Sequence, residues 1–408
     1  MPTNADRLPA ATAAWQPGDD PAWRQFASLG SLDLDLGGYL PQVDVAYETW
    51  GELSPARDNA VLVLHALTAD SHVVGTDGPG QPTEGWWQDI VGPGRPLDTD
   101  KWFVIASNVL GGCQGTTGPA SLAPDGRSWG SRWPRITVRD QVAVEVALAN
   151  HLEIDRFALI VGGSMGGLRA LEWAITEPDR VGAAVVLACG AAATADQIAV
   201  QTVQIQAITA DPQWAGGDYH DAGVGGGPHA GMGVARRFAH ITYRCEPEFS
   251  QRFGNKPQPG ENPYTGTAAG VIAGAGRFSV QSYLDHQANK LARRFDAGTY
   301  VTLTDTMSTH DVGRGRGGVD AALASIRSPV VVGGITSDRL YPLHLQQELA
   351  DKIPTASALH AIESPHGHDG FLLESEAIGT TIKEALALTA PVPTAQDSPP
   401  APTPAAED

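Results

Sequence analysis

The sequence predicts an α/β fold, in which a mostly parallel sheet has helices on both faces and an inserted helical lid. Short apolar runs typical of strands alternate with helix-like segments, and these runs lie at residues 43–50, 60–64, 102–106, 159–161, 183–188, 330–335 and 357–362. Strands separated by helices pair in parallel. Between about 190 and 325 the chain instead carries helix formers and Gly-broken segments. A single sheet does not need so long a connection between consecutive strands, so this stretch predicts a lid.

The individual elements follow from the spacing of the apolar side chains. Residues 43–50 alternate apolar and polar side chains, as half-buried strands do, whereas the run at 60–64 is typical of a fully buried strand. Residues 139–151 have helical apolar spacing. Further helix-like segments lie at 168–176, within the lid at 195–210, 235–243, 279–295 and 301–310, and after it at 343–353.

These elements set the predicted domain boundaries. The α/β core spans residues 21–190 and 326–390, and the helical lid spans residues 191–325. Both ends of the chain, residues 1–20 and 391–408, are rich in Pro and Ala, and we expect them to be disordered.

Composition narrows the classes of partner. The 408 residues carry a formal net charge of −19, so we expect no general affinity for nucleic acid or for an anionic membrane. Three scattered cysteines do not make a disulfide framework, and the longest apolar stretch, 181–193, is too short to span a bilayer. The first 20 residues lack the pattern of a signal peptide. These features predict a soluble cytoplasmic protein.

The most specific motif is the string Gly162-Gly163-Ser164-Met165-Gly166-Gly167, which follows a strand-like run and opens a helix-like segment. This is the G-x-S-x-G pattern in the strand–turn–helix context of a nucleophile elbow. Side chains at Gly162 and Gly166 would collide with the neighbouring strand and helix. The turn places Ser164 at a helix N-terminus, where backbone N–H groups stabilise a developing oxyanion.

A nucleophilic serine needs a base and an acid that orients it, in the chain order serine, acid, histidine. Asp338 follows the strand-like run 330–335, and His366 and His368 follow the run 357–362. All three therefore lie at the carboxyl ends of strands, on the ligand-binding edge of the sheet. The sequence predicts a catalytic triad of Ser164, Asp338 and His368, with His366 as the alternative base.

Two backbone N–H groups are the predicted oxyanion hole. One belongs to Met165, directly after the nucleophile, and the other to Leu67 in the loop after the strand 60–64. His65, in the same loop, is interpreted as a structural residue.

No metal or permanently bound cofactor is expected. His366 and His368 have no third ligand nearby in the sequence, and the three cysteines are interpreted as small apolar residues. The Gly-rich loop 111–118 lacks the Lys-Ser/Thr of a phosphate-binding P-loop.

Several motifs in one order resemble the homoserine O-acyltransferases of the α/β-hydrolase superfamily. They are His65-Ala66-Leu67-Thr68, Asp70-Ser71-His72-Val73, Asn108 to Pro119, the Ser164 string, Ala235-Arg236, Thr242-Tyr243-Arg244, Ser337-Asp338-Arg339-Leu340 and Gly367-His368-Asp369. The resemblance covers residues 40–385, and its most specific part is the string from Gly111 to Pro119. In two places the chain departs from the family: Ala69 stands where the family usually has Gly, and the Gly-rich stretch 216–233 is interpreted as an insertion, of unknown role.

The resemblance implies an α/β-hydrolase fold and a ping-pong transfer of an acetyl group from the co-substrate acetyl-CoA to the hydroxyl of L-homoserine, a step of methionine biosynthesis. It favours His368 over His366 as the base, and it implies a homodimer formed through the lid. Two alternatives remain open, namely a succinyl-CoA-dependent homoserine acyltransferase and an esterase.

An amino-acid acceptor would bring a carboxylate and an ammonium group to the site. Arg236 is expected to bind the carboxylate, and Asp369, next to the base, is expected to bind the ammonium. Arg237 is the next residue on the same helix-like segment, so it points about 100° away and only one of the two arginines can line the pocket. Which lid arginine is the anchor stays open, with Arg244 as a further candidate. An esterase needs neither Arg236 nor Asp369.

Overall fold

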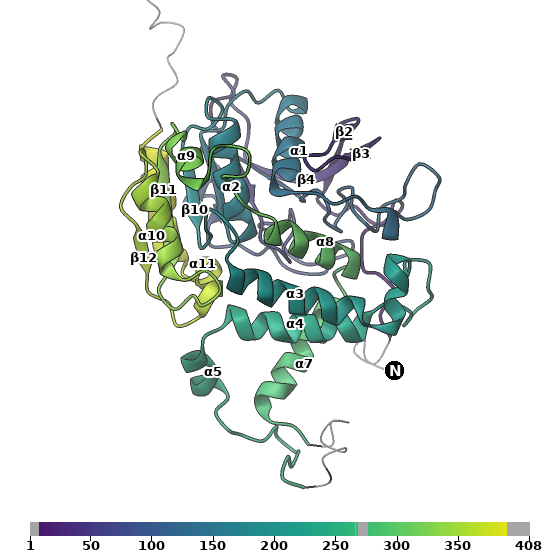
Figure 1. Cartoon of the computed structure of the whole chain (residues 1–408). Coiled ribbons are helices and arrows are strands. Elements are labelled where there is room, and N and C mark those ends of the chain that lie inside the picture. Colours follow the sequence, from purple (N-terminus) through teal and green to yellow (C-terminus); the bar gives the residue numbers. More distant parts are fainter. Residues whose placement is uncertain (1–7, 266, 268–275, 390–408) are drawn as a thin grey trace, which may run out of the picture.

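The computed structural model describes residues 8–265, 267 and 276–389, and its centre is a single mixed sheet (Figure 1). The strand order is β1-β4-β8-β5-β9-β10-β11-β12, in which β1–β4 and β4–β8 are antiparallel and all other neighbours are parallel. The bounds are β1 Gln25–Ser28, β4 Asp44–Trp50, β5 Ala60–Leu64, β8 Phe103–Ser107, β9 Leu159–Gly163, β10 Ala184–Leu187, β11 Val330–Ile335 and β12 His360–Ile362. The predicted mostly parallel sheet is therefore confirmed.

Two small sheets flank the main one. They pair β2 (Leu32–Asp33) with β3 (Tyr39–Leu40) and β6 (Val91–Gly92) with β7 (Leu97–Asp98). Neither contributes a side chain to the site described below.

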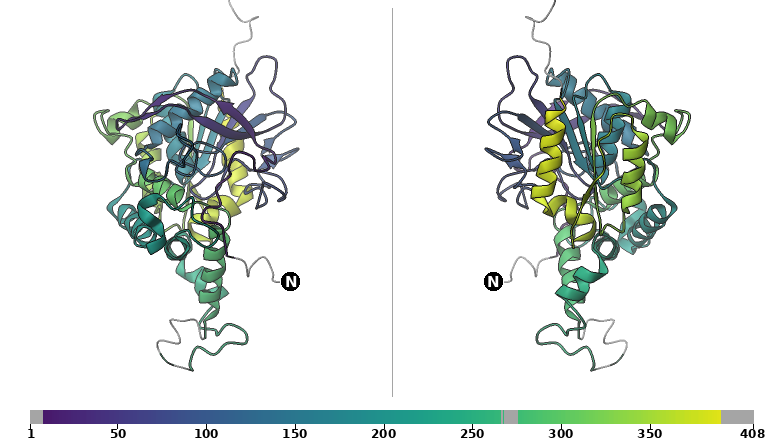
Figure 2. Two further views of the ribbon diagram at one scale, coloured as in Figure 1. Left: turned by 90° about the vertical axis from the view of Figure 1, so that its right-hand side faces the viewer. Right: turned by 90° about the vertical axis from the view of Figure 1, so that its left-hand side faces the viewer.

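Helices cover both faces of the main sheet because the central strands are buried on both sides. In β5, Leu62 packs with the core that includes α1 and α2, whereas Val61 and Val63 pack with the core that includes α12. One face is covered by α1 (Val138–His151), α2 (Met165–Thr176), α9 (Val319–Ala324) and α10 (Leu343–Lys352), and the other by α12 (Ser375–Ala387), with the short helix α11 (Gly370–Leu373) before it. Figure 2 shows α12 and α10 on opposite sides of the sheet.

The lid is a group of helices between β10 and β11. It contains α3 (Ala195–Thr209), α4 (His229–Tyr243), α5 (Glu246–Arg252), α7 (Ser279–Ala292) and α8 (Ala297–Ser308). Helix α4 packs against both α3 and α7, and α5 and α7 project away from the sheet (Figure 1). The last helix of the predicted lid range, α9, packs against α10 of the core instead, so the helical lid ends before residue 319.

The N-terminal segment differs from the prediction of a disordered tail over residues 1–20. Residues 8–20 lie against the body of the protein, where Ala11 and Ala14 are buried. The Thr12 hydroxyl donates to Asp296 Oδ1 at 2.8 Å, and the backbone N–H of Trp15 donates to the Cys113 carbonyl at 2.9 Å. Small side chains and specific hydrogen bonds thus anchor a segment whose composition is typical of disorder. Residues 1–7 and 391–408 lie outside the described residues.

In the described part of the chain, no helix is both long and apolar enough to cross a membrane. Within the same residues, no group of three or more His, Cys, Asp or Glu side chains is arranged to hold a metal ion.

Candidate active site

Ser164 occupies the sharp turn between β9 and α2. Its backbone has φ 56° and ψ −126°, a strained conformation for a residue with a side chain. The turn needs glycine on both sides, since a Cβ at Gly162 would lie 2.3 Å from the Gly166 carbonyl oxygen and one at Gly166 would lie 2.0 Å from the Leu64 carbonyl oxygen. The predicted collisions with helix and strand are confirmed, and the turn presents Ser164 to a cavity.

Asp338 and His368 form a buried hydrogen-bonded pair at the same edge of the sheet. His368, in the 3₁₀ turn Gly367–Asp369 after β12, bonds through Nδ1 to Asp338 Oδ2 at 2.6 Å. The other carboxylate oxygen, Oδ1, accepts from the N–H groups of Leu340 and Tyr341, which fixes the carboxylate. His368 Nε2 is buried and has no hydrogen-bond partner among the described residues. This nitrogen is the one left to accept a proton.

The environment of His368 raises its pKa above the ordinary value for histidine. Burial acts to lower the pKa, but the Asp338 carboxylate, through its charge and hydrogen bond, and the charge of Asp369 act in the opposite direction and prevail. Tyr341 stacks on the imidazole, with 5.4 Å between the ring centroids. The ring is therefore held in one orientation.

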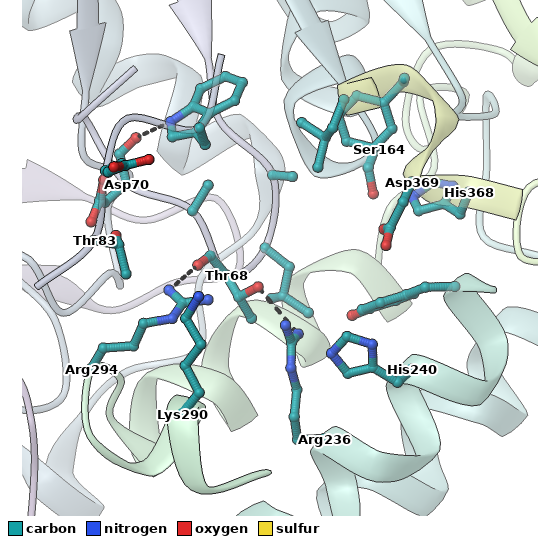
Figure 3. A pocket seen from close by; sticks show the side chains of 18 residues that line it. Thr68, Asp70, Thr83, Ser164, Arg236, His240, Lys290, Arg294, His368 and Asp369 are labelled. Carbon is teal, nitrogen blue, oxygen red and sulfur yellow. Dashed lines mark hydrogen bonds between the residues drawn. The ribbon is translucent and has the colours of Figure 1, made fainter. Parts of the chain in front are cut away.

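Ser164 and His368 line one cavity of about 280 Å³ between the core and the lid. Figure 3 shows Ser164, His368 and Asp369 on one side of it, and Thr68 between Arg236 and Arg294 on the other. His366 is not among the lining residues and lies 3.5 Å, through Nδ1, from Arg244 Nη1. Of the two histidines, His368 therefore lines the same cavity as Ser164, and His366 does not.

Of the two neighbouring arginines on α4, only Arg236 lines the cavity. Its Nη1 donates to the Thr68 hydroxyl at 3.3 Å, and its Nε is buried without a hydrogen-bond partner among the described residues. Arg237 instead pairs with Asp285 of α7 at 2.8 Å. The expectation that a single one of them would face the pocket is confirmed.

Asp369 also lines the cavity, and the structure gives it a partner that the sequence did not predict. Its Oδ2 lies 3.0 Å from Nε of Arg244, which in turn contacts Glu248 at 3.2 Å. Arg244 therefore neutralises acidic side chains and does not line the cavity.

The loop after β5 forms a tight turn beside Ser164. The Ala69 N–H donates to the Ala66 carbonyl at 3.1 Å, and Leu67 is a lining residue of the cavity. Met165 is buried as the first residue of α2, where backbone N–H groups have no partner within the helix. Of the two predicted oxyanion donors, Met165 thus directly follows the nucleophile, and Leu67 lines the same cavity as Ser164.

His65 holds this turn and does not act on the cavity. Burial, followed by the charge of Arg169, lowers its pKa to about 3, so the ring is neutral. Its Nε2 accepts from the Val109 N–H at 3.0 Å, so Nδ1 carries the proton and donates to the Ala66 carbonyl at 2.8 Å. The structural interpretation of His65 is confirmed.

Two cationic side chains that the sequence did not single out also line the cavity, Lys290 of α7 and Arg294 just after it. Both lie in a stretch with no recognisable motif, and only the packing of α7 against α4 brings them to the site. The cavity therefore carries more positive charge than the sequence suggested.

Comparisons with known proteins identify the fold and the family of this chain. Residues 59–375 match the family model described as the alpha/beta hydrolase fold. The homoserine O-acetyltransferase of Mycolicibacterium smegmatis is 59% identical over 360 residues, which cover 88% of this chain and 92% of that relative. The homoserine O-acetyltransferase of Thermobifida fusca is 58% identical over 378 residues, which cover 92% of this chain and 97% of the relative.

Solved structures share the fold. The homoserine O-acetyltransferase from Bacillus anthracis superposes with a TM-score of 0.78 at 23% identity and covers 89% of this chain and 97% of its own. Esterase E22 superposes with a TM-score of 0.79 at 24% identity, and the match covers 89% of this chain and 99% of the esterase chain. At these identities the likeness shows the fold alone, whereas the sequence relatives show the family. The chain belongs to the homoserine O-acetyltransferases of the alpha/beta hydrolase fold.

Proposed function

We propose that this protein transfers an acetyl group from acetyl-CoA to the side-chain hydroxyl of L-homoserine. The proposal rests on one observation. Ser164 and His368, which is hydrogen-bonded to Asp338, line the same cavity as the guanidinium group of Arg236. The first set of groups can move an acyl group. The second can select an amino-acid acceptor. Relatives that are 58–59% identical are homoserine O-acetyltransferases.

In the first half-reaction, His368 Nε2 takes the proton of the Ser164 hydroxyl while Oγ attacks the thioester carbonyl carbon. The backbone N–H groups of Leu67 and Met165 stabilise the oxyanion that forms. The carbon–sulfur bond then breaks, and the CoA sulfur takes the proton from the imidazolium. Asp338 stabilises that imidazolium and keeps the ring in the tautomer that the reaction needs.

In the second half-reaction, the homoserine hydroxyl gives its proton to His368 Nε2 and attacks the carbonyl carbon of acetyl-Ser164. The bond between this carbon and Ser164 Oγ breaks, and Oγ recovers the proton from His368. The products are O-acetylhomoserine and the free enzyme, so the same base serves both steps.

Two charged side chains would hold the acceptor. Among the described residues, the one hydrogen bond of the Arg236 guanidinium goes to the Thr68 hydroxyl and its Nε has no partner, so it can bind the homoserine carboxylate. Asp369 has one oxygen on Arg244, and its other oxygen can bind the ammonium group. Homoserine brings a carboxylate for Arg236 and an ammonium group for Asp369, whereas water brings neither. This arrangement therefore favours transfer to homoserine over hydrolysis.

The test is release of CoA from acetyl-CoA and from succinyl-CoA, each with and without L-homoserine. The proposal requires rapid, homoserine-dependent release from acetyl-CoA together with formation of O-acetylhomoserine. Preference for succinyl-CoA would overturn the acetyl donor, and equal release without homoserine would identify a hydrolase.

We also propose that two copies of the chain associate through the lid. Helices α3 and α4 expose Ile198, Val203, Val234 and Ile241, with fractional exposures of 40%, 45%, 53% and 39%. Val234 and Ile241 are seven residues apart and so lie on the same side of α4. We expect light scattering to give the mass of a dimer, and Val234→Glu to shift it towards the monomer. A monomeric wild-type protein would contradict the proposal.

The cytoplasmic location of the protein stays a prediction.

A further inference from the structure

Two guanidinium groups meet on Thr68, in the turn beside the nucleophile. Arg236 donates to its hydroxyl at 3.3 Å, and Arg294 Nη1 donates to its carbonyl at 2.7 Å (Figure 3). Among the described residues, neither arginine has a carboxylate within ion-pair distance. Burial and the charge of Arg236 lower the pKa of Arg294 to about 10, although the charge of Asp70 acts to raise it. Burying a charged group without an ion pair costs free energy, so the hydrogen bonds that hold this buried guanidinium need a physical explanation.

The Arg294 bond completes a set that fixes the turn on both sides of Leu67. Before Leu67, the Ala66 carbonyl accepts from the Ala69 N–H and from His65 Nδ1. After Leu67, the Thr68 carbonyl accepts from Arg294. The Thr68 carbonyl and the Ala69 N–H belong to one peptide group, and this N–H bonds to the Ala66 carbonyl. The Ala66 carbonyl in turn shares its planar peptide group with the Leu67 N–H, so the Arg294 bond acts on the direction of the Leu67 N–H through these two peptide groups.

Arg294 is itself held by the string from Gly111 to Pro119, which the proposed chemistry leaves without a role. The Gln114 side chain donates through Nε2 to the Arg294 carbonyl at 3.0 Å. Its Oε1 accepts from Arg24 Nη2 at 2.9 Å, and Arg24 Nη1 also donates to the Gly80 carbonyl at 2.8 Å. Hydrogen bonds therefore run without a break from Arg24 through Gln114 and Arg294 to Thr68.

We propose that Arg294 is a positioning residue for the oxyanion hole, because its bond to the Thr68 carbonyl orients the Leu67 N–H, and that Gln114 sets the position of Arg294. The inference rests on the proposed function, since it assumes that Ser164 is the acylated nucleophile. Arg294 touches no reacting atom in this account. It acts on the acylation of Ser164 through the turn, whereas Arg236 acts on the acceptor.

The test uses p-nitrophenyl acetate, which lacks both CoA and an amino-acid group, so that its cleavage reads only Ser164, its base and the oxyanion hole. We expect Arg294→Ala to slow p-nitrophenolate release about 10- to 100-fold, the loss expected when an oxyanion donor is misplaced. Arg237→Ala, an arginine paired with Asp285 outside the cavity, is the matched control and should keep the wild-type rate.

Chemical rescue separates positioning by a hydrogen bond from a general loss of structure. Millimolar methylguanidinium should restore part of the rate of Arg294→Ala, and methylammonium should not. A wild-type rate in Arg294→Ala, or a loss that methylguanidinium leaves unchanged at an unaltered melting temperature, would overturn the inference. A raised KM for homoserine with unchanged ester cleavage would do so too, because Arg294 would then bind the acceptor.

Should Arg294→Ala fail to fold, Arg294→Lys carries the test, since it keeps the charge and much of the length but loses the planar guanidinium. We expect about a 10-fold loss, because the ammonium cannot reproduce the fixed donor geometry. A wild-type rate in Arg294→Lys would show that charge alone suffices and would overturn the proposal.

The link to Gln114 is tested by a double-mutant cycle. Gln114→Leu should slow ester cleavage several-fold in the wild-type background and have little further effect in the Arg294→Lys background. Fully additive losses would separate Gln114 from Arg294. If the wild-type protein itself released no p-nitrophenolate, the proposed role of Ser164 would fail, which is a different outcome from unchanged Arg294 variants.

Discussion

The carboxyl edge of the sheet and the lid contribute to one cavity in different ways. Ser164, Asp338 and His368 follow strands β9, β11 and β12, so the pairing of neighbouring strands fixes their relative positions. Arg236 comes from α4 and Arg294 follows α7, so their positions depend on how the lid helices pack. We expect the sheet edge to supply the nucleophile and the base, and the lid to supply Arg236 for the acceptor and Arg294 for the position of the oxyanion hole.

This division makes the two regions separable by experiment. Substitutions at the edge of the sheet should stop both half-reactions, because His368 handles the proton in each. Substitutions at Arg236 should act mainly on the second half-reaction, in which homoserine is bound.

The largest difference is expected between the two histidines that follow β12. His368→Ala removes the base of both half-reactions and should lower kcat about 10⁶-fold. His366→Ala should cost only a few-fold, because His366 does not line the cavity. Steady-state kinetics with acetyl-CoA and homoserine measures both, and similar losses would break the assignment.

Asp338→Asn should reduce kcat by about 10⁴, because the amide holds the wrong tautomer of His368 and cannot stabilise the imidazolium. Leu340 and Tyr341 still donate to the remaining carbonyl oxygen in that variant, so we expect a normal circular dichroism spectrum. A loss of only a few-fold would assign the acid's role to another carboxylate, such as Asp369.

On the lid side, Arg236→Met should slow transfer to homoserine about 10- to 100-fold, the value of a hydrogen bond to a charged group. Acetylation of Ser164 should slow much less. Stopped-flow CoA release measures the first step and steady-state turnover measures the second, with Arg237→Met as the matched control. Equal losses in both steps would show that Arg236 also acts on the acylation of Ser164.

The smallest effect concerns pH. Asp338 and Asp369 raise the pKa of His368, and the base must be neutral, so activity should be lost on acidification at a higher pH than an ordinary histidine would give. Asp369→Asn removes one raising charge and should move this acidic limb to lower pH. The kcat/KM for p-nitrophenyl acetate, which has no ammonium group, reports the shift. An unchanged limb, or one at higher pH, would contradict this account.

Sequence reasoning located the sheet-edge residues because local patterns determine their positions. An apolar run followed by a glycine–serine string predicts a strand and an elbow, and an acid or histidine just after a strand must lie at the carboxyl edge. Helix geometry predicted that only one of Arg236 and Arg237 lines the cavity, and the structure shows that this residue is Arg236.

The remaining features depend on contacts between distant segments. Arg294 reaches Thr68, 226 positions away, and Gln114 reaches Arg294 across 180 positions, and no local pattern encodes either bond. The segment 8–20 has the composition of a tail, yet Thr12 bonds to Asp296 across 284 positions. Asp369 could be placed in the site from its neighbour His368, but its pair with Arg244 could not.

The central claim, that the core acylates Ser164 without help from the acceptor, is tested most directly by intact-mass spectrometry after mixing the protein with acetyl-CoA alone. We expect the wild-type protein to gain the mass of one acetyl group, to lose it when homoserine is added, and to show no gain in Ser164→Ala. An unmodified wild-type protein that still makes O-acetylhomoserine when both substrates are present would contradict the account.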